Sequence, residues 1–231
     1  MPPEEFREAA RRVADWAARY RDQVEEKPVL ARVEPGEVAD RLADSPPEEG
    51  EPFDDILDDV DRVVLQGITH WNHPGFFAYF SSSASAPATL AEFVAAALGT
   101  NAMLWRTSPA ATEMEERTVD WLRQWLALPE AFRGVILDTA STSSFTALLA
   151  AREEAGLRVR RKGLAGRSDL AVPTVYVSEE AHSSIEKAAI AAGIGQERVR
   201  RIPTDDRFRM RPGALARSME EDAAAGRRPT F

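Results

Sequence analysis

Short runs of β-forming residues alternate with longer helical patterns in the C-terminal part of the chain, and this alternation constrains the fold more than any other feature. The runs GVIL, TVYV and VRRI are each followed by a helix-forming stretch, and a last run, PTF, ends at Phe231. Strands that alternate with helices in this way are typical of a mostly parallel sheet with crossover helices. The sequence therefore predicts an α/β fold for this region.

Two amphipathic helices are predicted nearer the N-terminus. In the first, apolar residues recur every three or four positions from Phe6 to Val24, and in the second from Phe53 to Val64. Residues 27–52, rich in Pro, Glu and Asp, separate them. Neither apolar stripe has a large local core, so each needs the rest of the chain or a second copy to cover it. We expect an arm that packs on a partner subunit.

Composition excludes several classes of protein. The 231 residues contain no cysteine, which rules out disulfides, thiol nucleophiles and cysteine-based zinc sites. The 29 basic and 38 acidic residues give a net charge of −9, which argues against nucleic acid as a partner. The basic run RVRRKG at 158–163 is either a solvated connector or a phosphate contact. Three histidines without an acid cluster argue against a metal site.

No apolar run is long enough to span a bilayer, and the acidic start MPPEEFREAARR is unlike a secretory signal. These features favour a cytoplasmic protein with no membrane partner.

The stretch LDTASTSSFTALLAAR predicts a strand ending at Asp138, a loop of small hydroxylated residues, and a helix that begins near Ser143. Free N–H groups at such a helix start suit a phosphate. Because the chain has no Walker-type Gly-Lys-Ser/Thr sequence and no G-x-G-x-x-G, a nucleotide is disfavoured. The alternative is a plain Ser/Thr cap.

His182 lies one strand-helix unit later, in SEEAHSSIEKAA. Loops after parallel strands share one edge of the sheet, so His182 should lie on the same edge as Ala140 and Ser141. A phosphate site near an imidazole suits a phosphorylated aromatic ring, against which the histidine would stack. Taken alone, His182 would be a capping or surface residue.

An aromatic segment, THWNHPGFFAYFSSSASAPATL, begins at Thr69. Its aromatic side chains either pack in the hydrophobic core, with the serines in a turn that follows, or form the wall of a pocket whose serines contact a polar ligand.

Four separated motifs, HPGFFAYFSS, SPAATEMEERTVDWL, GVILDTASTSSFTALLAARE and AHSSIEKAA, resemble pyridoxal-phosphate-dependent amino-acid decarboxylases of the aromatic-L-amino-acid decarboxylase group (group II). The resemblance covers nearly the whole chain and corresponds to about the first half of such an enzyme. It implies the aspartate-aminotransferase-like fold, fold type I. We accordingly expect an N-terminal helical dimerisation arm at 1–85 and an incomplete cofactor-binding large domain at 86–231.

The resemblance also implies residue roles. Ala140 and Ser141 would hold the phosphate of pyridoxal 5'-phosphate, and His182 would stack on its ring as the catalytic histidine. We expect the substrate to be an L-amino acid with an aromatic side chain, in a pocket lined by Trp71, Tyr79, Phe80, Ser81 and Ser82. Asn101 and Met103 would reach the neighbouring subunit's site in a homodimer.

The sequence departs from the family pattern at the lysine that carries the cofactor as an aldimine. The chain has only Lys27, Lys162 and Lys187, and none lies in an N-P-H-K-like stretch; a D-A-A-like strand is also missing. We therefore expect a carboxy-lyase whose Schiff-base lysine is not among these residues, in a fragment that is inactive alone. The alternatives are a non-catalytic truncated paralogue or interaction module, and a fold type I aminotransferase.

Overall fold

The computed structural model describes residues 1–80, 84–171 and 173–231. Contacts between Cα atoms divide the chain into two compact units, Met1–Thr100 and Asn101–Phe231. The predicted division at residue 85, into a dimerisation arm and a cofactor-binding domain, stays a prediction. None of the described helices is long and apolar enough to cross a membrane.

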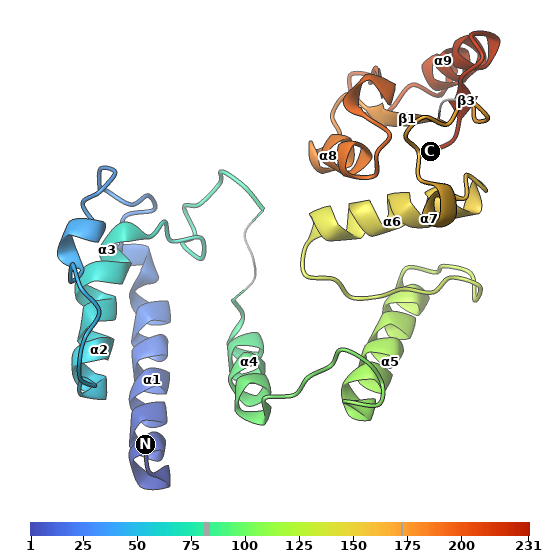
Figure 1. Cartoon of the computed structure of the whole chain (residues 1–231). Coiled ribbons are helices and arrows are strands. Elements are labelled where there is room, and N and C mark those ends of the chain that lie inside the picture. Colours follow the sequence, from blue (N-terminus) through green and yellow to red (C-terminus); the bar gives the residue numbers. More distant parts are fainter. Residues whose placement is uncertain (81–83, 172) are drawn as a thin grey trace. The chain divides into compact units, whose positions relative to one another are not determined.

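The first unit is helical (Figure 1). Its elements are α1 (Pro3–Gln23), η1 (Val24–Glu26), η2 (Ala39–Arg41), α2 (Phe53–Asp59), η3 (Val60–Val64), α3 (Leu65–Gly67) and α4 (Ala86–Leu98). The two predicted amphipathic helices are confirmed, but the second widens into a π-helical turn at η3 before it ends. Trp16 on α1 donates from Nε1 to Asp61 on η3 at 2.8 Å. This contact joins the two helices across the long polar link.

Local sequence signals explain where α4 begins and ends. Ser85 accepts a hydrogen bond from the N–H of Ala88 at 3.4 Å, and proline follows within the first turn. Serine caps and early prolines both favour a helix start. Gly99 ends the helix at φ +57°, a left-handed conformation that glycine adopts without steric cost.

A buried histidine anchors the first unit. His70 is only 2% exposed, and its Nδ1 is hydrogen-bonded to the hydroxyl of Tyr20 on α1 at 2.9 Å. The backbone N–H of His70 donates to the backbone carbonyl of Val29 at 2.9 Å. Burial lowers the pKa of His70, and the charges of Lys27 and His73 lower it further, so the imidazole is neutral at pH 7. This residue ties α1 to the segment that precedes the aromatic run.

The second unit holds a three-stranded parallel sheet. Its elements are α5 (Pro109–Trp125), α6 (Ala140–Glu154), α7 (Val159–Lys162), β1 (Pro173–Ser178), α8 (Ser184–Ala191), η4 (Gln196–Arg198), β2 (Val199–Ile202), α9 (Pro212–Ala224) and β3 (Arg228–Pro229). The strand order is β2-β1-β3, with Val175 opposite Val199 and Thr174 opposite Pro229. The core lies where α6 and α8 meet β1, and its buried members are Leu148, Val175, Ala188, Ala189, Ala192 and Ile194.

Asp222 of α9 links the strands from the other side of the core. Its carboxylate is 2% exposed and accepts from Tyr176 Oη at 2.8 Å, Arg200 Nε at 3.1 Å and Arg227 Nε at 2.6 Å. Burial acts to raise the pKa of Asp222, but the hydrogen bonds from Arg200, Tyr176 and Arg227 outweigh it and lower the pKa to about 2. Burial and the bond to Asp222 raise the pKa of Tyr176 to about 12.

The predicted strand GVIL is not formed within the described chain. Residues 132–137 have no regular structure, and the N–H of Ile136 donates to Glu115 Oε1 at 2.7 Å instead of to a neighbouring strand. Val135 and Ile136 are exposed. A strand needs a ladder partner for its N–H and C=O groups, and no described segment supplies one here. Helix α6 also begins at Ala140, three residues before the predicted start at Ser143.

Replacing Asp222 with alanine should lower the free energy of unfolding by about 3 kcal/mol, because it leaves the partly buried Arg200 and Tyr176 without their acceptor. The folded-state pKa of about 2 lies below the ordinary 3.8, so the stabilisation is present above pH 4 and is lost as the pH falls through 2. Urea unfolding at pH 7 and pH 3 measures both effects. Glu221→Ala, an exposed neighbour on α9, is the matched control; equal loss in both variants would contradict the role of Asp222.

Tyr20→Phe removes the hydroxyl that His70 Nδ1 contacts and leaves a buried nitrogen without a partner. We expect a loss of about 1–3 kcal/mol in the free energy of unfolding, together with a change in tryptophan fluorescence from Trp16 and Trp71, which lie beside the pair. Arg19→Gln, exposed on the same helix, should change neither signal. A Tyr20→Phe protein with unaltered stability and fluorescence would show that the contact does not anchor α1.

Candidate functional site

The start of α6 presents free hydrogen-bond donors. Thr139 caps the helix by accepting from the N–H of Thr142 at 3.1 Å, so the predicted hydroxyl cap exists. No acceptor within the described residues takes the N–H groups of Ala140 and Ser141, and both residues are exposed. Two free donors and a serine hydroxyl at the positive end of a long helix fit the phosphate of a bound cofactor.

His182 lies two residues before α8 and is exposed. Its Nδ1 accepts from the N–H of Ser184 at 3.2 Å, so the neutral ring carries its proton on Nε2. The loop before it is fixed by Glu179, whose N–H donates to the carbonyl of Ile202 at 2.9 Å and whose Oε1 accepts from Thr204 N at 2.6 Å. Those bonds from Thr204 lower the pKa of Glu179. His182 is thus held at the carboxyl end of β1.

Helices α6 and α8 run in the same direction, side by side. They pack against each other in the core, and Arg152, near the carboxyl end of α6, donates to the carbonyl of Ala192 at the carboxyl end of α8 at 2.9 Å. Because the carboxyl ends meet, the amino ends lie on the same side of the pair. Ala140, Ser141 and His182 all belong to those amino ends, although no printed contact joins the histidine to the other two.

The aromatic segment lies in the first unit. Trp71 stacks on Phe76 and Tyr79 with ring centroids 4.8 and 5.7 Å apart, so the structure brings together two of the predicted pocket residues. Phe80 is fully exposed and outside this stack. Ser81 and Ser82, also predicted to line the pocket, lie outside the described residues. Trp71 and Phe76 also border a cavity of about 540 Å³ that Tyr20, Arg21 and His73 share.

Asn101 and Met103 belong to the second unit. The side-chain oxygen of Asn101 accepts from the N–H of Met103 at 2.9 Å, which turns the loop before α5. Both side chains are exposed. The loop is therefore shaped by its own hydrogen bond and leaves Met103 free to contact another surface.

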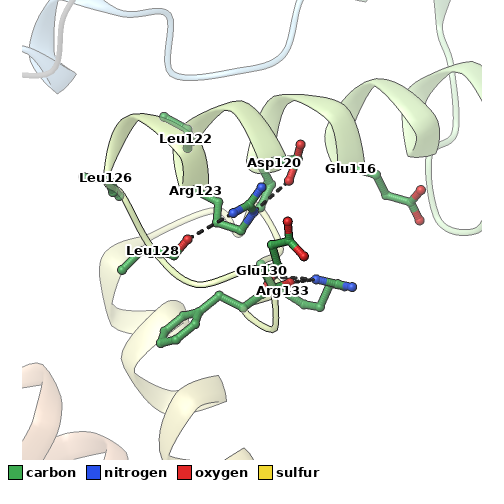
Figure 2. A pocket seen from close by; sticks show the side chains of 11 residues that line it. Glu116, Asp120, Leu122, Arg123, Leu126, Leu128, Glu130 and Arg133 are labelled. Atoms are coloured by element: carbon green, nitrogen blue, oxygen red, sulfur yellow. Dashed lines mark hydrogen bonds and ion pairs between the residues drawn. The ribbon is translucent and has the colours of Figure 1, made fainter.

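A cavity of about 780 Å³ contains none of the predicted site residues (Figure 2). It lies between the end of α5 and residues 128–134. Arg123 donates to Asp120 at 2.8 Å and to the carbonyl of Leu128 at 3.0 Å, and the bond from Arg123 lowers the pKa of Asp120. Arg123 and Asp120 are engaged with each other, and Arg133 donates to the carbonyl of Phe132 at 3.0 Å, so size alone does not make the cavity the site. The described residues include no metal-binding cluster of His, Cys, Asp or Glu.

Sequence reasoning did not find the partners that hold these residues. His70 was weighed only as a metal ligand, whereas the structure buries it against Tyr20, directly before Trp71. Nothing in the sequence around His182 predicts the bonds that Glu179 makes to Ile202 and Thr204. The only local indication of their importance is their place in the sequence: His70 directly precedes Trp71, and Glu179 lies three residues before His182.

The chain is similar to known proteins over its whole length. The model of the pyridoxal-dependent decarboxylase conserved domain matches residues 35–231. The mouse (Mus musculus) aromatic-L-amino-acid decarboxylase is 37% identical over all of this chain and 50% of its own length. The chain thus spans about half the length of such relatives.

Two solved structures match the fold. The Catharanthus roseus tryptophan decarboxylase in complex with L-tryptophan has a TM-score of 0.90 and 37% identity, over 100% of this chain and 49% of that one. The Oryza sativa TDC with PLP and tryptamine has a TM-score of 0.89 and 37% identity, over 100% and 50%. The predicted fold type I architecture, with its N-terminal helix and parallel sheet, is confirmed as a partial domain. The chain belongs to the pyridoxal-dependent decarboxylase family, whose cofactor is pyridoxal phosphate.

Proposed function

We propose that this chain provides cofactor-binding elements of a carboxy-lyase that removes CO₂ from an L-amino acid with an aromatic side chain. The observation that carries the proposal is the pair of free N–H groups at Ala140 and Ser141, on the same side of the α6–α8 pair as His182. Pyridoxal phosphate, when bound, supplies the sink for the electrons left as CO₂ departs.

Residues at the amino ends of α6 and α8 would bind different parts of the cofactor. Ala140 and Ser141 would donate to the phosphate from the start of α6, where the helix dipole adds about 0.3–1 kcal/mol. His182 would lie against the pyridine ring, its orientation fixed by the bond from Ser184 N–H to Nδ1. Such stacking is worth about 0.5–1.5 kcal/mol, so its main role would be to orient the ring.

Substrate selection is assigned to the aromatic segment and to the loop before α5. The stack of Trp71 on Tyr79 offers a flat apolar wall, which suits an aromatic side chain, and the related structures hold tryptamine or L-tryptophan. Phe80, Ser81 and Ser82 would complete the wall. Asn101 and Met103 would contribute from the second subunit of a homodimer.

The homodimer is supported by apolar side chains that the described chain leaves uncovered. Exposed large apolar residues recur on α4 and α5, namely Leu90, Phe93, Val94, Leu98, Met114, Trp121, Leu122 and Trp125. Exposed patches of this kind mark protein interfaces. We propose that the arm and these helices pack on a second copy in the cytoplasm, with no nucleic acid or membrane as partner.

The function is tested by expressing the complete reading frame of the source gene and measuring CO₂ release from L-tryptophan, L-tyrosine and L-phenylalanine with pyridoxal phosphate present. In that protein, His182→Ala should lower kcat/KM at least ten-fold and weaken cofactor binding about 2–10-fold, the range expected for one lost ring contact. Glu180→Gln, an exposed neighbour on the same loop, is the matched control and should keep both values.

The alternatives have distinct outcomes in the same assay. Amino-group transfer without CO₂ would identify an aminotransferase. Neither reaction, with the dimer intact, would identify a non-catalytic module. Full activity of the His182→Ala protein would remove the histidine from the site.

The lysine that carries the cofactor is proposed to lie outside residues 1–231. Lys27 follows η1, Lys162 ends α7 and Lys187 is exposed in the first turn of α8, and none of them lies in an N-P-H-K-like stretch. Borohydride treatment of the 231-residue chain with pyridoxal phosphate should therefore leave no stoichiometric label on any one lysine, as read by peptide mass spectrometry. A single, fully labelled lysine among the three would overturn this assignment.

A further inference from the structure

A second cavity in the first unit has a basic wall. It has a volume of about 340 Å³ and lies between the residues after η1, the helical turn η2, the end of α3 and His70. Its charged lining residues are Glu26, Lys27, Arg32 and Arg41. Three cations thus face one carboxylate, in a chain whose net charge is −9.

The three cationic side chains make no polar contact that stabilises the described part of the fold. Within the described residues, no ion pair or side-chain hydrogen bond engages Lys27, Arg32 or Arg41. Other arginines of the same unit do have carboxylate partners: Arg12 pairs with Asp54, and Arg62 with Asp59 at 2.5 Å. The cavity therefore gathers positive charge that local carboxylates leave uncompensated.

His70 gives the cavity a rigid polar wall. The residue is nearly fully buried, its Nδ1 is engaged by Tyr20, and no partner within the described residues takes Nε2. When Tyr20 donates to Nδ1, the ring proton lies on Nε2 and is free to donate. The charge of Lys27 acts on this ring, because it lowers the pKa of His70.

We propose that this cavity binds a small oxyanion of charge about −2, of the class of inorganic phosphate or a short dicarboxylate. Guanidinium groups match such oxygens in geometry and charge, and the surplus of two positive charges matches the ligand. The volume is at the small end of the range for ligand pockets. The helix start at Ala140 belongs to the other unit.

Binding would have a structural consequence. An anion held by Arg32 and Arg41 would fix residues 26–41 against His70, and His70 directly precedes Trp71 of the aromatic stack. Trp71 fluorescence is therefore a reporter of occupancy that does not depend on any enzymatic activity.

The test is a calorimetric and fluorescence titration of the purified protein with sodium phosphate, sodium sulfate and sodium succinate, against sodium chloride at equal ionic strength. We expect saturable binding of phosphate or succinate, weakened about ten-fold by Arg32→Gln or by Arg41→Gln and abolished in the double variant. Arg62→Gln, on η3 outside the cavity, is the matched control and should leave the affinity unchanged.

Binding at the α6 start is distinguished by a second variant. Ser141→Ala should leave the Arg32- and Arg41-dependent binding in place, even if it weakens the cofactor. Three outcomes would overturn the proposal: no saturation in the millimolar range, a signal that chloride reproduces, or an affinity that the two arginine variants do not change. None of these outcomes bears on the decarboxylase proposal, which is tested by CO₂ release.

Discussion

The parallel packing of α6 and α8 on β1 is the constraint on which the candidate site depends. Small residues on α8, Ala188, Ala189 and Ala192, let it approach Leu148 and Val175 closely, and Arg152 joins the carboxyl ends through the carbonyl of Ala192. Two helices so fixed must present their amino ends together. Both helix starts then offer unsatisfied N–H groups or polar side chains at the same edge, which is what binding one ligand by its phosphate and its ring requires.

Much of the fold could be predicted from sequence because its signals are local. The runs TVYV and VRRI form β1 and β2. Ser85 and Ser108 cap α4 and α5, because their hydroxyl oxygens accept backbone N–H groups of the first turn. The run GVIL does not form a strand, although its residues favour β-structure as much as those of TVYV do. A strand also requires a neighbour to bond with, and sequence pattern within the segment says nothing about whether one is present.

The candidate site was predictable to the same degree. Residue types predicted a helix start near Ser143, three residues after the observed start of α6 at Ala140, and an imidazole in the loop that follows β1. The roles of Ala140, Ser141 and His182 come from the family resemblance and stay predictions. The anchor of the aromatic segment was not predictable, since His70 is buried by Tyr20, which lies 50 residues away in the sequence. The basic cavity was missed for the same reason: Lys27, Arg32 and Arg41 are spread along a segment whose composition is mostly acidic and proline-rich.

The two polar centres of the chain handle charge in opposite ways. Asp222 is buried and fully compensated, because a carboxylate removed from water is tolerated only with donors around it. Arg32 and Arg41 have Glu34, Glu37 and Asp40 close by in sequence, yet Glu37 accepts the N–H of Glu34 at 3.1 Å and no carboxylate of the described chain pairs with either arginine. A purely structural role would favour pairing with these neighbours. Cations that face a cavity instead, beside a neutral donor on a fixed ring, are arranged for an anion that comes from outside the chain.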